Sequence, residues 1–191
     1  MRITRADATP YALPFASEYV TARGRLERRE MVLLELSSDE GPVGLGEAVP
    51  MSLRGGAGLR QVEREVRERC AERLVGLNVG PDGVDPAPLA AGLSSPARAA
   101  IEMALIDLAS KLDGVPAWRH LGADSAEPIE CNATLVAGPP EAVARDAAEW
   151  LGRGFRTFKL KVGVPGDVEQ VAAVRAAIGP EARIRVDANG V

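Results

Sequence analysis

Short apolar runs separated by turn residues mark the first 50 residues as rich in strands. One such run covers residues 31–36, Met-Val-Leu-Leu-Glu-Leu, and a second covers residues 43–48. The Ser-Ser-Asp-Glu-Gly segment at 37–41 between them has the residue types that favour a tight turn. A further strand begins at Ile3, so we expect residues 1–50 to form a small antiparallel meander.

Apolar residues recur at helical spacing in the next part of the chain. We predict a helix over residues 59–74 and, because residues 76–94 are rich in Gly, Pro and Asp, an irregular connection after it. Ser95, Pro96 and Gly114 have the positions typical of an N-cap, a first helical residue and a residue beyond the helix end. The apolar stripe of this second helix predicts core packing and no chemistry; it consists of Ala97, Ala100, Ile101, Ala104, Leu105, Leu108 and Leu112.

The pattern changes after residue 122 to a strict alternation of strands and helices. Five elements are predicted in the order strand, helix, strand, helix, strand, over residues 130–137, 139–153, 155–162, 166–178 and 184–187. Consecutive βα units predict parallel strands that are joined by right-handed crossovers and covered by helices. We therefore divide the chain into an α+β domain over residues 1–124 and an α/β domain over residues 125–191. The three predicted strands of the α/β domain would leave apolar faces and an open edge uncovered.

Two lysines fall on one face of the second strand in this series. Side chains alternate along a strand, so Lys159 and Lys161 point to one side while Phe158 and Leu160 point to the other. A Lys-X-Lys tripeptide usually marks a solvated face or a protected edge. Strands inside βα units are covered and seldom edges, which favours a functional pair here. Two ammonium groups side by side repel each other, so one of them loses its proton more readily and can act as a general base.

A carboxylate lies at the end of the next predicted strand. Asp187 opens the segment Asp-Ala-Asn-Gly at 187–190, and as a hard oxygen ligand it suits a metal ion close to the lysines. A base beside a metal ion suits removal of a proton from the carbon next to a carboxylate, because the metal stabilises the resulting enediolate.

The composition and net charge of the chain exclude some classes of binding partner. The 191 residues carry a formal net charge of −4, which gives no electrostatic footprint for nucleic acid or for an anionic membrane. The two cysteines, Cys70 and Cys131, have a spacing that suggests neither a disulfide framework nor a zinc site. The N-terminus lacks the apolar core of a signal peptide, and no stretch has the apolar length of a membrane span. We expect a soluble cytoplasmic protein.

Four segments, in this order and spacing, resemble the enolase superfamily and within it the muconate-lactonizing subgroup. They are Gly-Pro-Val-Gly-Leu-Gly-Glu-Ala at 41–48, the helical segment 97–108 with Gly-Val-Pro at 114–116, Lys-Leu-Lys at 159–161, and Asp-Ala-Asn-Gly at 187–190. The resemblance covers nearly the whole chain. It implies an α+β capping domain followed by the start of a TIM-type barrel, incomplete in this chain, with the active site at the C-terminal ends of the barrel strands.

The resemblance also implies roles for individual residues. Lys161 would be the base on one face of the substrate, and Lys159 would adjust its basicity. Asp187 would be the first of three acidic ligands for Mg²⁺, with Mn²⁺ as an alternative. Asn189 is a candidate substrate-binding residue at the family's polar position two residues on, for a supporting hydrogen bond. Independently of the resemblance, Arg54 lies beside the glycine-rich segment 55–58 and is a candidate for binding a substrate carboxylate, although a solvated surface arginine is the commoner case.

Members of the subgroup share abstraction of the α-proton and differ in the later steps of the reaction. The segments 21–24, 28–29 and 132–136 look most like those of o-succinylbenzoate synthases, which dehydrate a cyclohexadiene carboxylate in menaquinone synthesis. An N-acylamino acid racemase, a dipeptide epimerase or a muconate cycloisomerase is the alternative. Racemisation needs acid/base groups on both faces of the substrate, whereas dehydration needs a base on only one. In each case we expect a lyase or isomerase, a small-molecule carboxylate as substrate, and a homo-oligomer.

The chain would hold only half of such a site, which suggests a different class of function. The other metal ligands and the opposing lysine would lie beyond Val191, so we expect the chain alone to be inactive. It would be either part of a longer enzyme or a non-catalytic fragment that needs a partner. His120 and Glu47, which lie far from the lysine strand in sequence, are assigned structural roles.

Overall fold

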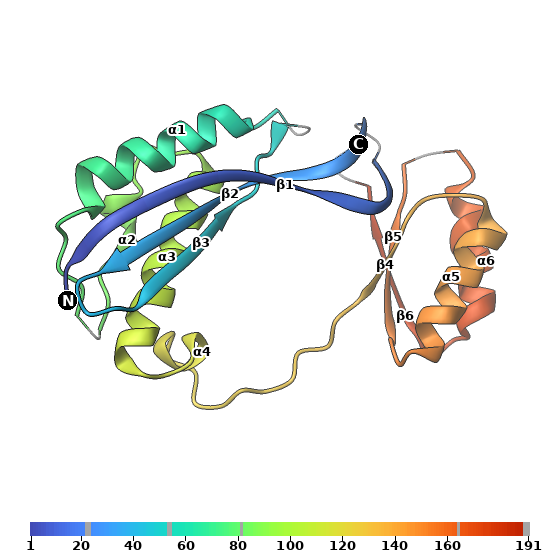
Figure 1. The fold of residues 1–191 in the computed structure, drawn as a ribbon. Helices are drawn as coiled ribbons and strands as arrows, with labels where there is room; N and C mark the ends of the chain where they lie inside the picture. Colours follow the sequence, from blue (N-terminus) through green and yellow to red (C-terminus); the bar gives the residue numbers. More distant parts are fainter. Residues whose placement is uncertain (22–23, 53–54, 81, 164, 189–191) are drawn as a thin grey trace. The chain divides into compact units, whose positions relative to one another are not determined.

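The computed structural model describes residues 1–21, 24–52, 55–80, 82–163 and 165–188 (Figure 1). The chain divides into two compact units. Unit 1 comprises residues 1–15 and 28–126, and unit 2 comprises residues 16–27 and 127–191. In the part of the chain that is described, no helix is both long enough and apolar enough to cross a membrane.

The N-terminal part of the chain forms a three-stranded sheet, which confirms the predicted meander; its residues belong to unit 1 except for 16–27. The strands are β1 (Ile3–Thr21), β2 (Gly24–Ser38) and β3 (Val43–Ala48), in the order β1-β2-β3. Strands β2 and β3 pair antiparallel, with Val32 opposite Ala48 and Ser37 opposite Val43. β2 starts seven residues earlier than the apolar pattern predicted, because residues 27–30 are all charged and give no apolar signal although they pair within the sheet.

The helices of unit 1 follow the predicted order. Helix α1 (Leu59–Arg69) runs into a π-helical turn, η2 (Cys70–Leu74), and together they fill the predicted range 59–74. The predicted irregular connection contains one helical turn, α2 (Pro86–Leu89), where the Asp85 side chain accepts a hydrogen bond from the backbone N–H of Ala87 at 2.9 Å. Helix α3 (Ser95–Asp113) and the short α4 (Ala117–His120) complete the unit.

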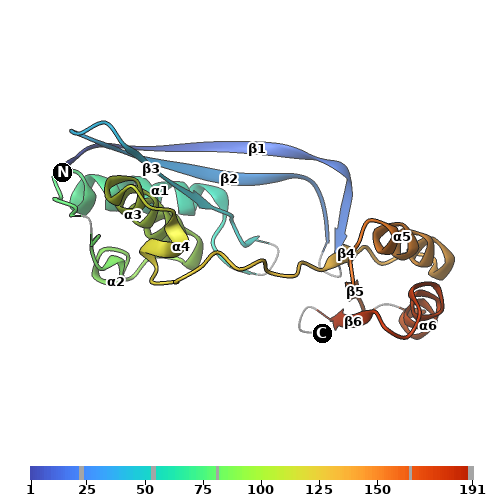
Figure 2. The same cartoon turned by 90° about the horizontal axis from the view of Figure 1, so that it is seen from below.

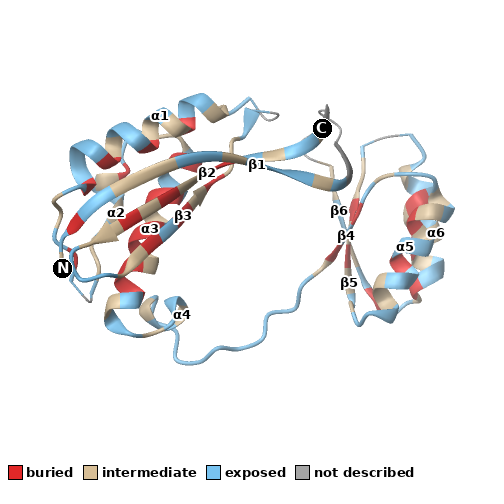
Figure 3. Cartoon of the chain, in the orientation of Figure 1, coloured by how far each residue is buried: buried red, intermediate tan, exposed pale blue. Residues whose placement is uncertain are grey.

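Helix α3 begins one residue before the predicted start. Ser94, not Ser95, is the N-cap residue, and it makes no side-chain capping bond because its hydroxyl donates to Glu65 of α1. The far end is as predicted, since Gly114 has the left-handed φ of 68° that terminates helices. The stripe from Ala97 to Leu108 is buried and forms the centre of the unit 1 core, with β2 and α1 (Figure 3).

Two glycines let strand β3 pack directly on α3. A Cβ atom on Gly46 would lie 1.9 Å from the carbonyl oxygen of Ala100, and one on Gly44 would lie 2.3 Å from the carbonyl oxygen of Ala104. Helix α3 also covers the open edge of β3, because Asp107 accepts a hydrogen bond from the N–H of Leu45 at 2.8 Å. The close packing of this sheet on the helix therefore requires the two glycines of the Gly-Leu-Gly motif.

Unit 2 contains the predicted βαβαβ series. Its elements are β4 (Ala133–Leu135), α5 (Pro140–Gly152), β5 (Thr157–Lys161), α6 (Asp167–Ile178) and β6 (Arg183–Asp187). The strands are parallel in the order β4-β5-β6, and both helices lie on one side of them (Figure 2). The core between sheet and helices includes Phe158, Leu160, Ala147 and Val174. β4 is much shorter than the predicted strand 130–137, since residues 127–131 are exposed and lie outside the ladder.

The predicted fold class is confirmed by these two units. An antiparallel sheet with helices is followed by a parallel α/β arrangement, as the change of pattern after residue 122 indicated. The face of the parallel sheet that turns away from α5 and α6 carries the polar side chains that form the candidate site.

Candidate active site

The alternation of side chains along β5 places the two predicted lysines on one face. Phe158 and Leu160 are fully buried against the helices, whereas Lys159 and Lys161 are half-buried on the other face. The buried pair fixes the register of the strand, because a shift by one residue would place both ammonium groups in an apolar core. The apolar residues of β5 thus determine which way its lysines point.

Asp187 joins the lysines at the end of the neighbouring strand. The parallel register places Lys161 opposite Asp187. The Nζ atom of Lys161 lies 2.6 Å from the Asp187 Oδ2 atom, and the Nζ atom of Lys159 lies 3.0 Å from the same oxygen. The side chain of Lys161 is the least exposed of the three, at 16%. Two cations therefore share one carboxylate oxygen, which holds the like charges together at the carboxyl ends of β5 and β6.

Backbone contacts fix the same strand ends. The N–H of Val162 donates to the carbonyl oxygen of Asp187 at 3.1 Å, one residue beyond the end of β5. The next loop is held by Asp167, whose side chain accepts a hydrogen bond from the N–H of Gly163 at 3.1 Å. Gly166, with φ of 86°, then starts α6 in a conformation that glycine adopts without strain.

Gln170 is a contributor to this region that the sequence analysis missed. It is 2% exposed in α6 and bonds to the backbone of Lys161 and of Gly138. A signal was present in the sequence, because Gln170, Val174 and Ile178 lie four residues apart on one helical stripe whose other members are apolar. A polar residue in such a stripe usually has a specific hydrogen-bonding partner.

The donor set fits one part of a divalent cation site. Asp187 supplies a hard carboxylate oxygen, and Mg²⁺ commonly takes only one or two carboxylates from a protein together with other oxygen ligands. Across the described residues there is no group of three or more His, Cys, Asp or Glu side chains that could hold a metal ion. A cation at Oδ2 would also compete with two ammonium groups. Asp187 is therefore suited to be one ligand of a site that needs more.

The other predicted residues divide into two groups. Arg54 and Asn189 lie outside the described residues. Glu47 accepts a hydrogen bond from the Tyr11 hydroxyl in unit 1, which raises the pKa of Tyr11. His120 is the last residue of α4. Its Nε2 atom lies close to Gly83, 3.4 Å from the position that a Cβ atom on that glycine would take.

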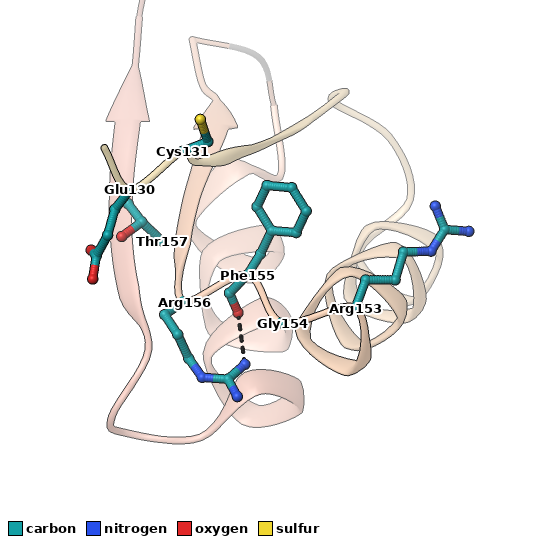
Figure 4. A pocket seen from close by; sticks show the side chains of 7 residues that line it. All are labelled: Glu130, Cys131, Arg153, Gly154, Phe155, Arg156 and Thr157. Atoms are coloured by element: carbon teal, nitrogen blue, oxygen red, sulfur yellow. Dashed lines mark hydrogen bonds between the residues drawn. The ribbon is translucent and has the colours of Figure 1, made fainter. Parts of the chain in front are cut away.

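A shallow hollow of about 240 Å³ lies at the opposite, amino ends of β4 and β5 (Figure 4). It is lined by Glu130, Cys131, Arg153, Gly154, Phe155, Arg156 and Thr157. Two of its charged groups already have partners: the Arg156 guanidinium donates to the carbonyl oxygen of Phe155 at 3.0 Å, and Glu130 pairs with Arg183 at 3.2 Å. Arg153 points away from the hollow (Figure 4). No polar groups converge there, so we assign it no chemistry.

Family comparisons match both units. The model described as the mandelate racemase / muconate lactonizing enzyme N-terminal domain matches residues 3–122. A second model, described as enolase C-terminal domain-like, matches residues 142–191. The second match includes β5, β6 and the group formed by Lys159, Lys161 and Asp187.

Individual relatives are epimerases and racemases. The chain is 31% identical over 195 positions to the L-Ala-D/L-Glu epimerase of Bacillus subtilis, covering 99% of this chain and 53% of that protein. It is 34% identical over 197 positions to the N-succinylamino acid racemase of Thermus thermophilus, covering 99% of this chain and 52% of that protein. The chain thus spans about half the length of the curated relatives it matches.

Solved structures agree with these sequence matches. The substrate-liganded L-Ala-D/L-Glu epimerase from Bacillus subtilis superposes with a TM-score of 0.88 at 29% identity, covering 99% of this chain and 54% of that one. The dipeptide epimerase from Enterococcus faecalis, complexed with Mg and the dipeptide L-Leu-L-Tyr, superposes with a TM-score of 0.89 at 27% identity and the same coverage.

Proposed function

The chain belongs to the mandelate racemase / muconate lactonizing enzyme family of the enolase superfamily, and from that premise we propose that it forms one half of an epimerase or racemase. The reaction is transfer of the proton on the carbon next to a carboxylate, with inversion at that carbon. The substrate class is an N-acylated α-amino acid, which includes dipeptides. This class unites the substrates named for the relatives, namely dipeptides and N-succinylamino acids.

The observation that carries the proposal is the sharing of one Asp187 oxygen by two lysines. In its neutral form Lys161 takes the α-proton, and it is the more enclosed of the two amines. Lys159 contacts the same Asp187 oxygen at 3.0 Å and therefore lies directly beside the proposed base. Three residues with different roles thus meet at the carboxyl ends of two adjacent strands, where barrel enzymes place their chemistry.

Asp187 would hold a divalent cation as one oxygen ligand. A bound Mg²⁺ would supply positive charge next to the substrate carboxylate, where negative charge accumulates when the α-proton leaves. The Enterococcus faecalis relative is known as a complex with Mg and a dipeptide. In this proposal the remaining ligands come from strands that the present chain does not contain.

Inversion also requires a proton donor on the opposite face of the substrate. If Lys161 removes the proton from one face, a second acid must return a proton to the other face, and the product then differs only in configuration at that carbon. The described residues near Asp187 supply one face only. The proposal therefore assigns the second acid to the rest of the barrel.

Dehydration is the less supported reading. The sequence analysis favoured an o-succinylbenzoate synthase, but the relatives described above are epimerases and a racemase. Their names support the alternative of racemisation or epimerisation, and nothing in them supports a role in menaquinone synthesis. Both reactions begin with the same proton abstraction, so Lys161 has the same role in each.

The test is proton exchange in the complete natural protein. With Mg²⁺ in D₂O, a panel of dipeptides and N-succinylamino acids should lose the α-proton signal in the proton NMR spectrum while the opposite stereoisomer accumulates. Lys161→Ala should abolish inversion, and it should abolish exchange for the stereoisomer whose α-proton faces Lys161. A panel that shows neither exchange nor inversion, while a cyclohexadiene carboxylate substrate is dehydrated, would overturn the proposal in favour of the lyase.

A further inference from the structure

Gln170 uses both ends of its carboxamide inside unit 2. Its Nε2 atom donates to the carbonyl oxygen of Lys161 at 3.2 Å, and its Oε1 atom accepts from the N–H of Gly138 at 3.1 Å. The side chain is 2% exposed, so neither bond can be replaced by bulk water without opening the structure. The two partners lie just beyond β4 and at the last residue of β5.

The carbonyl group of Lys161 faces β4 and accepts the hydrogen bond from Gln170. Val162 donates its N–H to Asp187, so the backbone of Val162 faces β6. Successive residues of a strand direct their backbone groups to opposite edges, and Lys161 therefore faces β4. That strand ends at Leu135, which is paired with Leu160, so the ladder stops one residue short of Lys161.

The Gln170 carboxamide continues the interrupted ladder. A carboxamide offers one N–H donor and one carbonyl acceptor, the same groups that a peptide unit offers to its neighbours. It therefore occupies the place of a peptide unit between the ends of β4 and β5, where the chain departs into its loops. Since both strand ends are held by one side chain, a shift of either would break a buried hydrogen bond.

We propose that Gln170 is a positioning residue that fixes the backbone of Lys161 and thereby places its ammonium nitrogen beside Asp187. The inference rests on the proposed function for the role of Lys161 as base, but the clamp itself is a property of the two hydrogen bonds. The role proposed for Gln170 requires no direct contact with substrate or metal. It acts through the end of β5 and couples the segment at Gly138 to the lysine.

The first test replaces the carboxamide by an apolar group of similar length. In the complete protein, Gln170→Met should lower kcat by about 10- to 100-fold with little change in KM, because the base is displaced while substrate binding is kept. Amide hydrogen exchange at Gly138 and Val162 should accelerate in the same variant. Gln61→Met is the matched control, since Gln61 is an exposed residue of α1 that bonds only to Glu65 among the contacts described.

A second variant separates positioning from simple loss of stability. In Gln170→Glu the introduced carboxyl, when protonated, has one O–H donor and one carbonyl acceptor and can restore both bonds. When ionised it can only accept, and it repels the Lys161 carbonyl oxygen. The ratio of kcat in the variant to kcat in the parent should therefore rise as the pH falls, whereas the ratio for Gln170→Met should stay constant. Lys161, Asp167 and Asp187 are present in all three proteins, and the ratio for Gln170→Met, which adds no charge, shows how far their own titration contributes.

The outcomes separate this inference from the proposed function. If the parent catalyses α-proton exchange and Gln170→Met keeps its kcat, the inference fails and the proposed function stands. If the parent is inactive on every N-acylated amino acid, the proposed function fails, and hydrogen exchange at Gly138 and Val162 still decides whether the clamp exists. Unchanged exchange at both amides in Gln170→Met would overturn the clamp whatever the activity.

Discussion

The Nζ atom of Lys161 lies 2.6 Å from the Asp187 Oδ2 atom, across two adjacent parallel strands. Both lysines contact this carboxylate, so its charge matters to both. Asp187→Asn keeps an oxygen of the same size but removes that charge. In the complete protein we expect Mg²⁺ affinity, measured by isothermal titration calorimetry, to fall at least about tenfold, because a neutral amide is a much weaker ligand for a hard cation.

Asp167→Asn is the matched control for this substitution. Asp167 accepts a hydrogen bond from Gly163 in the loop after β5, and an asparagine oxygen can accept the same bond. The control should bind Mg²⁺ like the parent. Equal affinities in both variants would show that Asp187 is not a metal ligand.

Gly46 in β3 is expected to tolerate no side chain. The Cβ atom of Gly46→Ala would lie 1.9 Å from the Ala100 carbonyl oxygen, so strand and helix must move apart. We expect the free energy of unfolding, from urea denaturation, to fall by about 2–3 kcal/mol. Gly152→Ala should not lower it, because Gly152 is the last residue of α5 with open space around it, and Ala favours a helix more than Gly does. A similar stability for both variants would contradict the close packing of β3 on α3.

Much of this fold could be predicted from local pattern. The βαβαβ order followed from the alternation of strand and helix patterns along the chain, and the burial of Phe158 and Leu160 settles the face of Lys159 and Lys161. The charged start of β2 could not be predicted, since its pairing comes from a neighbouring strand and not from its own hydrophobicity.

The members of the candidate site were predicted from strand alternation and from the position of Asp187 at the end of the next strand, but their contacts were not. Alternation predicts which residues share a face, but the common contact of both lysines with one Asp187 oxygen depends on the register between strands, which sequence spacing does not fix. The clamp by Gln170 links segments 32 residues apart and was missed for the same reason.

The two cysteines are expected to differ in reactivity. Cys70 is buried in unit 1, and burial raises the pKa of its thiol to about 12, so almost no thiolate forms at neutral pH. Cys131 is exposed in unit 2. A thiol-specific reagent such as 5,5′-dithiobis(2-nitrobenzoate) should therefore modify one thiol of the native protein rapidly and the second only after unfolding. Cys131→Ser is the control, and rapid modification of that variant would contradict the burial of Cys70.

Glu65 links α1 to the start of α3 and makes stability depend on pH. Its carboxylate accepts hydrogen bonds from the backbone N–H of Ser94, at 3.0 Å, and from the Ser94 hydroxyl. Burial alone would raise the pKa of Glu65, but the bonds from Ser94 and Gln61 outweigh it, so the pKa is lower in the folded protein than in the unfolded chain. A group with a lowered folded pKa stabilises the protein above its unfolded pKa, near 4.5, and loses that contribution as the pH falls through the folded pKa.

Glu65→Gln should therefore destabilise the protein at pH 7 by on the order of 1 kcal/mol, and by clearly less near pH 3, where the parent carboxyl is itself becoming neutral. The measurement is the free energy of unfolding of parent and variant, from urea denaturation at both pH values. Glu68→Gln, an exposed change on the same helix, should show no such dependence. If the destabilisation by Glu65→Gln were the same at pH 3 and pH 7, the charge of Glu65 would contribute nothing to the junction of α1 and α3.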